Sequence, residues 1–260
     1  PEQPHVRQYA SLDSLLADAE VELISLCSPR RDTQAADALR CLAAGKHVYA
    51  EKPCALNEAD LDRIIEVAQR GPARFREMAG TAFEEPYLTM REIVSSGRLG
   101  AVTQVFAQKS YPLGNRPQDV GIVGGIITWV GMHALRFMEH VSGLRIKEIE
   151  ARETGLGNNG TGALKTAAVF SMTLENGAVA AAVCNYFNPR GFGQHGNEHL
   201  RIFGTEGFVE AVDGGARTRL VIGNDDLGAL SCQKSRPPYE DLYFQELLGL
   251  NTMPLSLEAE

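Results

Sequence analysis

The sequence contains no uninterrupted apolar run of the roughly 20 residues that would cross a bilayer as a helix. Its amino end, Pro-Glu-Gln-Pro-His, lacks the charged and then apolar pattern of a secretory signal. Low-complexity tracts, which would indicate disorder, are also missing. These absences predict a folded protein of the cytoplasm that does not insert into a membrane.

Cysteine is scarce, and none of the five cysteines forms a Cys-x-x-Cys pair. They are Cys27, Cys41, Cys54, Cys184 and Cys232. This spacing argues against a zinc knuckle and against a disulfide framework, so reduced and mostly buried thiols are expected. The intervals between His133 and His140 and between His195 and His199 resemble those of metal ligands, but neither pair has an obvious third ligand. No metal is expected.

Positive charge is limited as well. The chain has 25 Lys and Arg against 33 Asp and Glu, a formal net charge of -8, and only Arg30 and Arg31 are adjacent. Such a chain is repelled by the phosphate backbone, so nucleic acid is not an expected partner. With 260 residues, 44% of them hydrophobic and 22% charged, the composition is that of a globular protein with one large domain or two ordinary ones.

Helix and strand patterns alternate in the first third of the chain. Residues 21–27 form a compact β-prone run, and residues 33–42 place apolar side chains on one helical face before Gly45. A second strand follows at residues 47–50, and Asn57 caps a second helix. This alternation predicts a parallel sheet that binds ligands beyond the carboxyl ends of its strands.

The remainder of the chain is dominated by longer strands. Residues 167–174 and 178–183 flank Glu175-Asn176-Gly177, a hairpin turn, and a second hairpin surrounds Gly204-Thr205-Glu206. Helices are expected only near residues 86–96 and 128–141. We therefore predict an α/β domain over residues 1–84, with an incomplete Rossmann-like parallel sheet, and an α+β substrate domain over residues 85–260, with a mainly antiparallel open sheet.

The segment Gly155-Leu156-Gly157-Asn158-Asn159-Gly160 has the glycine spacing of a dinucleotide phosphate loop. That loop requires a helix directly after the glycines, because free amide groups at the helix amino end hold the pyrophosphate. Here the β-prone run Lys165–Leu174 follows instead. The glycines are therefore predicted to form a flexible loop between strands of the second domain.

The most specific stretch is Gly45-Lys46-His47-Val48-Tyr49-Ala50-Glu51-Lys52-Pro53. It resembles the Gly-Lys-His-Val and Glu-Lys-Pro signature of the glucose-fructose oxidoreductase, inositol dehydrogenase and rhizopine catabolism family, written Gfo/Idh/MocA. Four further segments resemble the family in the same order along the chain. They are Ser95–Gly100, Gly124–Leu135, Leu200–Gly207 and Pro254–Glu258.

This resemblance implies hydride transfer between a sugar or cyclic polyol and NAD or NADP. It implies cofactor contacts from the residues that follow the two parallel strands, which are Ser28, Pro29, Arg30, Glu51, Lys52 and Pro53. It also implies that Lys52 and His133 are catalytic, since lysine can hold a hydroxyl and histidine exchanges protons near neutrality. Lys52 and His133, together with Trp129, are the predicted substrate contacts.

The resemblance further implies segments that the sequence does not contain. About 60 residues with a Gly-x-Gly-x-x-Gly turn, at ~30 residues per strand-helix unit, precede the corresponding segment in the family. We therefore expect the chain to be a fragment, inactive alone, without the site that distinguishes NAD from NADP. A further helix is expected beyond Glu260.

Two alternatives remain open at the level of sequence. Trp129 stands where the family commonly carries an aspartate, and an indole cannot accept a proton, which favours a non-catalytic ligand sensor or regulatory subunit. Redox-neutral glycoside cleavage assisted by a nicotinamide is a second possibility. The resemblance also predicts a homo-oligomer joined through the open face of the sheet.

Overall fold

The structure is a computed structural model that describes residues 6–78, 80–232 and 237–257. The chain forms two compact units, one of Pro1–Met78 with Gln245–Glu260 and one of Ala79–Phe244. The sequence predicts a domain boundary at residue 84 and assigns the carboxyl-terminal segment to the second domain. In the structure that segment returns to the first unit, where Leu257 packs against the core.

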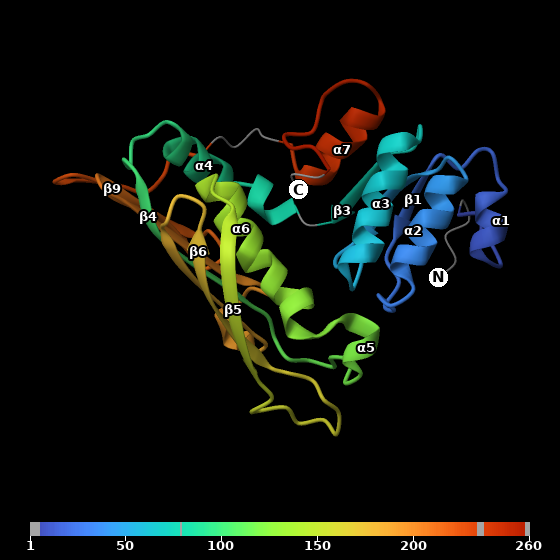
Figure 1. The fold of residues 1–260 in the computed structure, drawn as a ribbon, viewed down its shortest axis with the longest axis horizontal. Helices are drawn as coiled ribbons and strands as arrows, with labels where there is room; N and C mark the ends of the chain where they lie inside the picture. Colours follow the sequence, from blue (N-terminus) through green and yellow to red (C-terminus); the bar gives the residue numbers. More distant parts are fainter. Residues whose placement is uncertain (1–5, 79, 233–236, 258–260) are drawn as a thin grey trace. The chain divides into compact units, whose positions relative to one another are not determined.

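The first unit is built on a parallel sheet with the strand order β1-β2-β3. Its elements are α1 (Leu12–Leu16), β1 (Leu23–Leu26), α2 (Gln34–Ala43), β2 (His47–Glu51), α3 (Glu58–Arg70) and β3 (Phe75–Met78). Ile24, Val48 and Phe75, one from each strand, form a common core with α2 and α3, which lie side by side in Figure 1. The predicted cap is present, because the Asn57 Oδ1 accepts a hydrogen bond from the Asp60 amide at 2.9 Å.

The second unit is built on an eight-stranded sheet with the order β11-β10-β9-β8-β4-β7-β6-β5. Its strands are β4 (Val102–Ser110), β5 (Ile146–Thr154), β6 (Ala167–Leu174), β7 (Val179–Asn185), β8 (Asn197–Gly204), β9 (Gly207–Val212), β10 (Arg217–Ile222) and β11 (Asp225–Gly228). All neighbouring pairs are antiparallel except β4 with β7. The predicted fold class, a partial Rossmann-like sheet followed by a mainly antiparallel open sheet, is thus confirmed.

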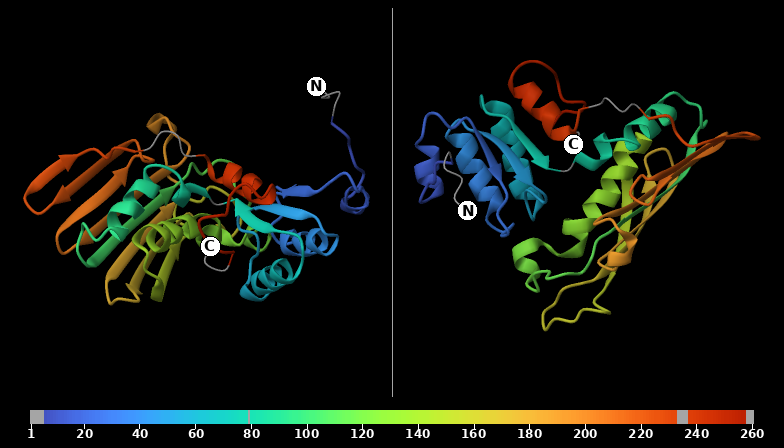
Figure 2. Two further views of the ribbon diagram at one scale, coloured as in Figure 1. Left: turned by 90° about the horizontal axis from the view of Figure 1, so that it is seen from above. Right: turned by 180° about the vertical axis from the view of Figure 1, so that it is seen from behind.

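Helices cover one face of the eight-stranded sheet, as Figures 1 and 2 show. The helical segments of this unit are η1 (Gly80–Phe83), α4 (Tyr87–Ser95), α5 (Val120–Val123), the π-helical turn η2 (Ile127–Gly131), α6 (Met132–Ser142) and η3 (Arg190–Phe192). A last helix, α7 (Tyr239–Leu247), contains the boundary between the two units. Alternate residues of β4 and β8, such as Val105, Ala107, Leu200 and Ile202, are buried under the covering helices.

The stretch Val120–Ser142 is long enough and apolar enough in composition to cross a membrane. The sequence prediction considered only uninterrupted apolar runs and therefore passed over this stretch, which also contains Arg136 and Glu139. Phe137 and Val141 of α6 are fully buried, and α6 packs against β4. These contacts are those of a core helix of the second unit.

Candidate functional site

Lys52 directly follows the middle strand of the parallel sheet and is 8% exposed. The strand register pairs Leu26 with Ala50 and Ala50 with Glu77, so all three strands end at the same edge. Residues that follow β1 and β2 therefore lie at one edge of the sheet. This is the edge at which parallel sheets bind ligands.

The backbone around Lys52 is held by two buried side chains from the loop and helix that follow β1. Arg31 Nε donates to the Lys52 carbonyl at 3.1 Å, and Gln34 Nε2 donates to the carbonyl of Pro53 at 3.1 Å and also to that of Glu51. On the other side, Glu77 of β3 accepts from the Cys54 amide at 2.8 Å. These bonds tie the segment that carries Lys52 to the loop and helix that follow β1 and to strand β3.

Burial also shapes the charges at this edge. Desolvation raises the pKa of Glu51, while the charges of Lys52 and Arg31 oppose that rise. Desolvation lowers the pKa of Arg31, and Glu51, at 3.8 Å, is the largest opposing influence. The segment thus carries two cationic side chains and one carboxyl group that burial biases toward its neutral form.

The other predicted cofactor contacts lie at the same edge, in the loop after β1. Ser28 Oγ accepts from the Arg30 amide at 3.1 Å, and the exposed Arg30 guanidinium contacts Asp32, with 3.2 Å between Nε and Oδ1. The structure therefore brings Ser28, Pro29 and Arg30 to the edge that carries Lys52. Arg30 and its neighbour differ sharply, because Arg31 is buried beneath Lys52 while Arg30 faces solvent.

His133 belongs to the second unit and lies in the first turn of α6, where it is 6% exposed. Its imidazole contacts the ring of Tyr111, with 6.1 Å between centroids, in the segment just after β4. Tyr111 in turn contacts His195, with 5.2 Å between centroids, in the loop before β8. Two histidines from distant segments therefore border one tyrosine ring.

A π-helical turn precedes His133 and contains Trp129, which is partly exposed. Wide turns of this kind are frequent at functional sites. At its end, Gly131 lies so close to β6 that an added Cβ would stand 2.7 Å from Phe170 Cζ. A glycine is therefore needed where this turn meets the sheet.

A buried ion pair lies near the end of β4. Lys109 of β4 and Glu198 of β8 are register partners, form a salt bridge and are 3% and 10% exposed. Lys109 Nζ also stands 4.8 Å from the centroid of the Tyr111 ring. The negative charge of Glu198 is therefore neutralised next to the side chains that border Tyr111.

A cavity of about 540 Å³ opens beside this cluster. It is lined by the segment Pro112–Arg116 after β4, by Arg190 of η3 and by residues 193–195. These segments are joined, because Asn188 Nδ2 donates to the carbonyls of Gln194 and His195 at 2.9 and 3.1 Å, and the Asn188 amide donates to the Tyr111 carbonyl at 3.1 Å. The cavity is therefore formed by the loops at one end of the second sheet.

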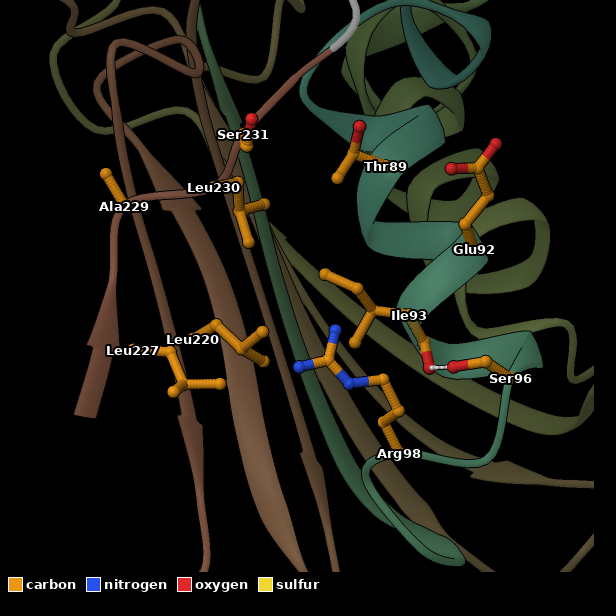
Figure 3. Close-up of a pocket in the computed structure, with 10 residues that line it drawn as sticks. All are labelled: Thr89, Glu92, Ile93, Ser96, Arg98, Leu220, Leu227, Ala229, Leu230 and Ser231. Carbon is orange, nitrogen blue, oxygen red and sulfur yellow. Dashed lines mark hydrogen bonds between the residues drawn. The ribbon is translucent and has the colours of Figure 1, made fainter. Parts of the chain in front are cut away.

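A second hollow of about 470 Å³ lies between α4 and the β10–β11 hairpin. Figure 3 shows Ile93 of α4 facing Leu220 and Leu227, with Arg98 beneath them. None of the site residues predicted from the sequence lines this hollow. We therefore do not assign the candidate site to it.

The glycine-rich segment 155–160 lies between β5 and β6, as predicted, and no helix follows it. Asn158 Nδ2 donates to Gln118 Oε1 at 3.0 Å, and a Cβ on Gly157 would stand 2.8 Å from Phe187 Cζ. The glycines allow close packing within the second unit. Among residues 6–78, 80–232 and 237–257, no cluster of three or more His, Cys, Asp or Glu could hold a metal ion.

The sequences of the two units match two models that describe parts of one protein family. Residues 1–77 match the model described as "Oxidoreductase family, NAD-binding Rossmann fold", and residues 87–210 match the GFO/IDH/MocA C-terminal domain. The chain belongs to the Gfo/Idh/MocA oxidoreductase family. The resemblance predicted from Gly45–Pro53 and the later segments is thereby confirmed.

Relatives in this family support the assignment at low identity. Myo-inositol 2-dehydrogenase of Thermotoga maritima is 25% identical over 248 residues, which are 93% of this chain and 72% of that protein. Trans-1,2-dihydrobenzene-1,2-diol dehydrogenase of Bos taurus is 30% identical over 139 residues, 53% of this chain. The latter match spans only 41% of the bovine protein.

Solved structures show the same fold. A putative oxidoreductase from Thermotoga maritima has a TM-score of 0.86 and 28% identity, covering 96% of this chain and 77% of that one. Levoglucosan dehydrogenase, solved in complex with NADH and L-sorbose, has a TM-score of 0.79 at 13% identity, covering 95% of this chain and 76% of that one. The second likeness concerns the fold alone.

Sequence reasoning missed the residues that position the site. Arg31, Gln34 and Glu77 fix the segment around Lys52, and Lys109 and Glu198 form the buried pair beside Tyr111. The one available indication was position, since Arg31 and Gln34 follow a strand whose end was already predicted to bind ligand.

Proposed function

We propose that this chain acts in an NAD(P)-dependent oxidoreductase that moves hydride between the hydroxyl-bearing carbon of a sugar or cyclic polyol and a nicotinamide. Family membership supports the reaction class, and the names of the relatives support a polyol or related alcohol. The observation that carries the proposal is the burial of Lys52 at the carboxyl end of β2, in a segment whose backbone is bonded to the loop after β1 and to β3.

The residues at this edge suit a nicotinamide cofactor. The parallel strands end together, and two cations, Arg31 and Lys52, lie among backbone groups that are already ordered. Ser28, Pro29, Arg30, Glu51, Lys52 and Pro53 would hold the cofactor. When bound, the cofactor supplies the hydride chemistry.

The protein's own side chains would manage the substrate hydroxyl. The ammonium group of Lys52, a compact donor of up to three hydrogen bonds, would orient the hydroxyl oxygen. His133 would take up or release the hydroxyl proton, as a positioned histidine commonly does. Trp129 would pack its indole face against the sugar ring.

Nicotinamide fluorescence, followed with a panel of sugars and cyclic polyols, tests this proposal. In a complete protein that contains this chain, we expect turnover with at least one compound and a loss of about 10² or more in rate for Lys52→Ala, because the group that orients the reacting hydroxyl is removed. Lys147→Ala, which removes an exposed lysine on β5, is the matched control and should retain full activity. Saturable sugar binding without any nicotinamide turnover would overturn the proposal in favour of a ligand sensor.

We also propose that the protein is a homo-oligomer joined through the uncovered face of the eight-stranded sheet. Val169 of β6 and Val179 of β7 point to this face and are 47% and 53% exposed. Sedimentation equilibrium of the wild type and of Val169→Asp tests the proposal. A monomeric wild type would contradict it.

A further inference from the structure

The cavity beside Tyr111 is lined by positively charged side chains and by none that is acidic. The guanidinium groups of Arg116 and Arg190 border it, and the residues that line it include no Asp or Glu. The nearby carboxylate of Glu198 is already neutralised by Lys109. The local charge is therefore positive in a chain whose formal net charge is -8.

Arg116 is held in place by aromatic rings. Its guanidinium carbon stands 4.8 Å from the centroid of Tyr186 and 5.8 Å from that of Tyr111, and its Nη2 donates to the Pro112 carbonyl at 3.2 Å. Guanidinium groups stack on aromatic faces and bind planar anions through two parallel hydrogen bonds. Among the residues that the structure describes, this is the one hydrogen bond from its five N–H groups, so donors remain for a ligand.

Arg190 supplies a second guanidinium from η3, in a loop joined to the Tyr111 segment through Asn188. In the described part of the chain, neither Arg116 nor Arg190 has a carboxylate within the 4.0 Å that defines an ion pair, whereas Arg201, Arg217 and Arg219 each have one. Among the described residues, the guanidinium charges of the two arginines at the cavity are thus not neutralised by a carboxylate, as those of Arg201, Arg217 and Arg219 are.

The cavity and the proposed proton-transfer residue share an aromatic neighbour. His195, which lines the cavity, and His133 both contact the Tyr111 ring, at 5.2 and 6.1 Å between centroids. A substrate with its reacting hydroxyl at His133 would therefore direct one substituent toward Arg116 and Arg190. Buried or confined cations favour an anionic substituent at that place.

We propose that this cavity binds an anionic oxygen group of the substrate, so that the protein acts on acidic sugars or polyols in preference to neutral ones. This inference rests on the function proposed above and deepens it. Arg116 and Arg190 would hold the anionic oxygens of either a carboxylate or a phosphate group on the substrate. The two sources are distinguished by experiment.

Calorimetric titration with D-glucose, D-glucuronate and D-glucose 6-phosphate tests the proposal without requiring turnover. At least one acidic sugar should bind about tenfold or more tightly than glucose, the effect of one charge-assisted hydrogen bond. Tighter binding of glucuronate identifies a carboxylate site, and tighter binding of the phosphate ester identifies a phosphate site. Added salt should weaken the preference.

Variants link the preference to the cavity. Arg190→Gln, at an exposed position where folding is not at risk, and Arg116→Gln should each abolish most of the preference, while Arg116→Lys should restore part of it. Arg152→Gln on β5 is the control and should change nothing. Three results would each overturn the proposal. They are equal affinity for glucose and both acids, no saturable binding of either acid, and an unchanged preference in both glutamine variants. Because binding is measured without nicotinamide, a failure of the proposed redox function would leave this result unaffected.

Discussion

His133 and His140 are two buried histidines on one helix, and they allow chemistry to be separated from packing. Both are 6% exposed, but His133 borders Tyr111 whereas His140 contacts Phe83, at 5.1 Å between centroids. We expect His133→Asn to lower kcat by about 10² to 10⁴ with a modest change in Tm. His140→Asn should lower Tm similarly and keep kcat. Equal kcat in the two variants would remove His133 from the mechanism.

His47 at the start of β2 should make stability depend on pH. Desolvation, followed by the charge of Arg74, lowers the pKa of His47, and its Nδ1 accepts from the Arg74 amide at 2.9 Å. The unfolded chain therefore binds the proton more readily, so this contribution is fully present above about pH 6.5 and is lost as the pH falls below it. Urea unfolding at pH 7.5 and 5.5 should show a smaller loss for His47→Gln than for the wild type. A loss of the same size in both would refute the assignment.

For single residues, the sequence predicts local features such as helix caps better than it predicts which side chains are buried. The Asn57 cap depends only on four consecutive residues, 57–60, and is confirmed. Arg30 and Arg31 look alike in the sequence, yet Arg31 is buried under Lys52 and Arg30 is exposed. That choice depends on Glu51 and on the carbonyl of Lys52, about 20 residues away.

Gly157 in the loop between β5 and β6 tests the interpretation of the glycine-rich segment. Its φ is +84° and an added Cβ would stand 2.8 Å from Phe187 Cζ, so Gly157→Ala should lower stability by about 1–2 kcal/mol or more. Cofactor affinity, measured by nicotinamide fluorescence, should stay the same. At Gly177 the φ is +86° and no atom lies within 4 Å of an added Cβ. The loss of stability in Gly177→Ala therefore measures the cost of the backbone conformation alone. A large loss of cofactor affinity in Gly157→Ala alone would mean that this loop binds phosphate after all.

Long-range contacts also explain which elements the sequence could not predict. Residues 128–141 have the period of one helix, but the structure begins this region with a π-helical turn where Gly131 meets Phe170. The parallel pairing of β4 with β7 is likewise invisible to local patterns, because hairpin turns specify only neighbouring antiparallel strands. The two predicted hairpins, in contrast, are present as β6–β7 and β8–β9.

For the whole molecule, the return of residues 245–257 to the first unit has an energetic consequence. Glu246 contacts Arg76 of β3 at 3.4 Å, and the two side chains are 16% and 7% exposed. Glu246→Gln should cost about 1–3 kcal/mol, since the largely buried guanidinium of Arg76 loses the negative charge opposite it. Hydrogen exchange should accelerate at β3 and stay unchanged at β6. Glu240→Gln, at an exposed position of the same helix, is the control, and protection of β3 that is unaffected by Glu246→Gln would contradict the prediction.

The position of β4 in the sheet also sets an order of events during synthesis. β4 ends at Ser110, whereas its two partners begin only at Val179 and Asn197. The strand at the middle of the finished sheet therefore leaves the ribosome with both of its edges unpaired, a state that invites pairing with other chains. Lys109 stays charged and without Glu198 throughout this interval. An inward-pointing charge of this kind opposes premature association, and its salt bridge to Glu198 can form only after β8 has been made.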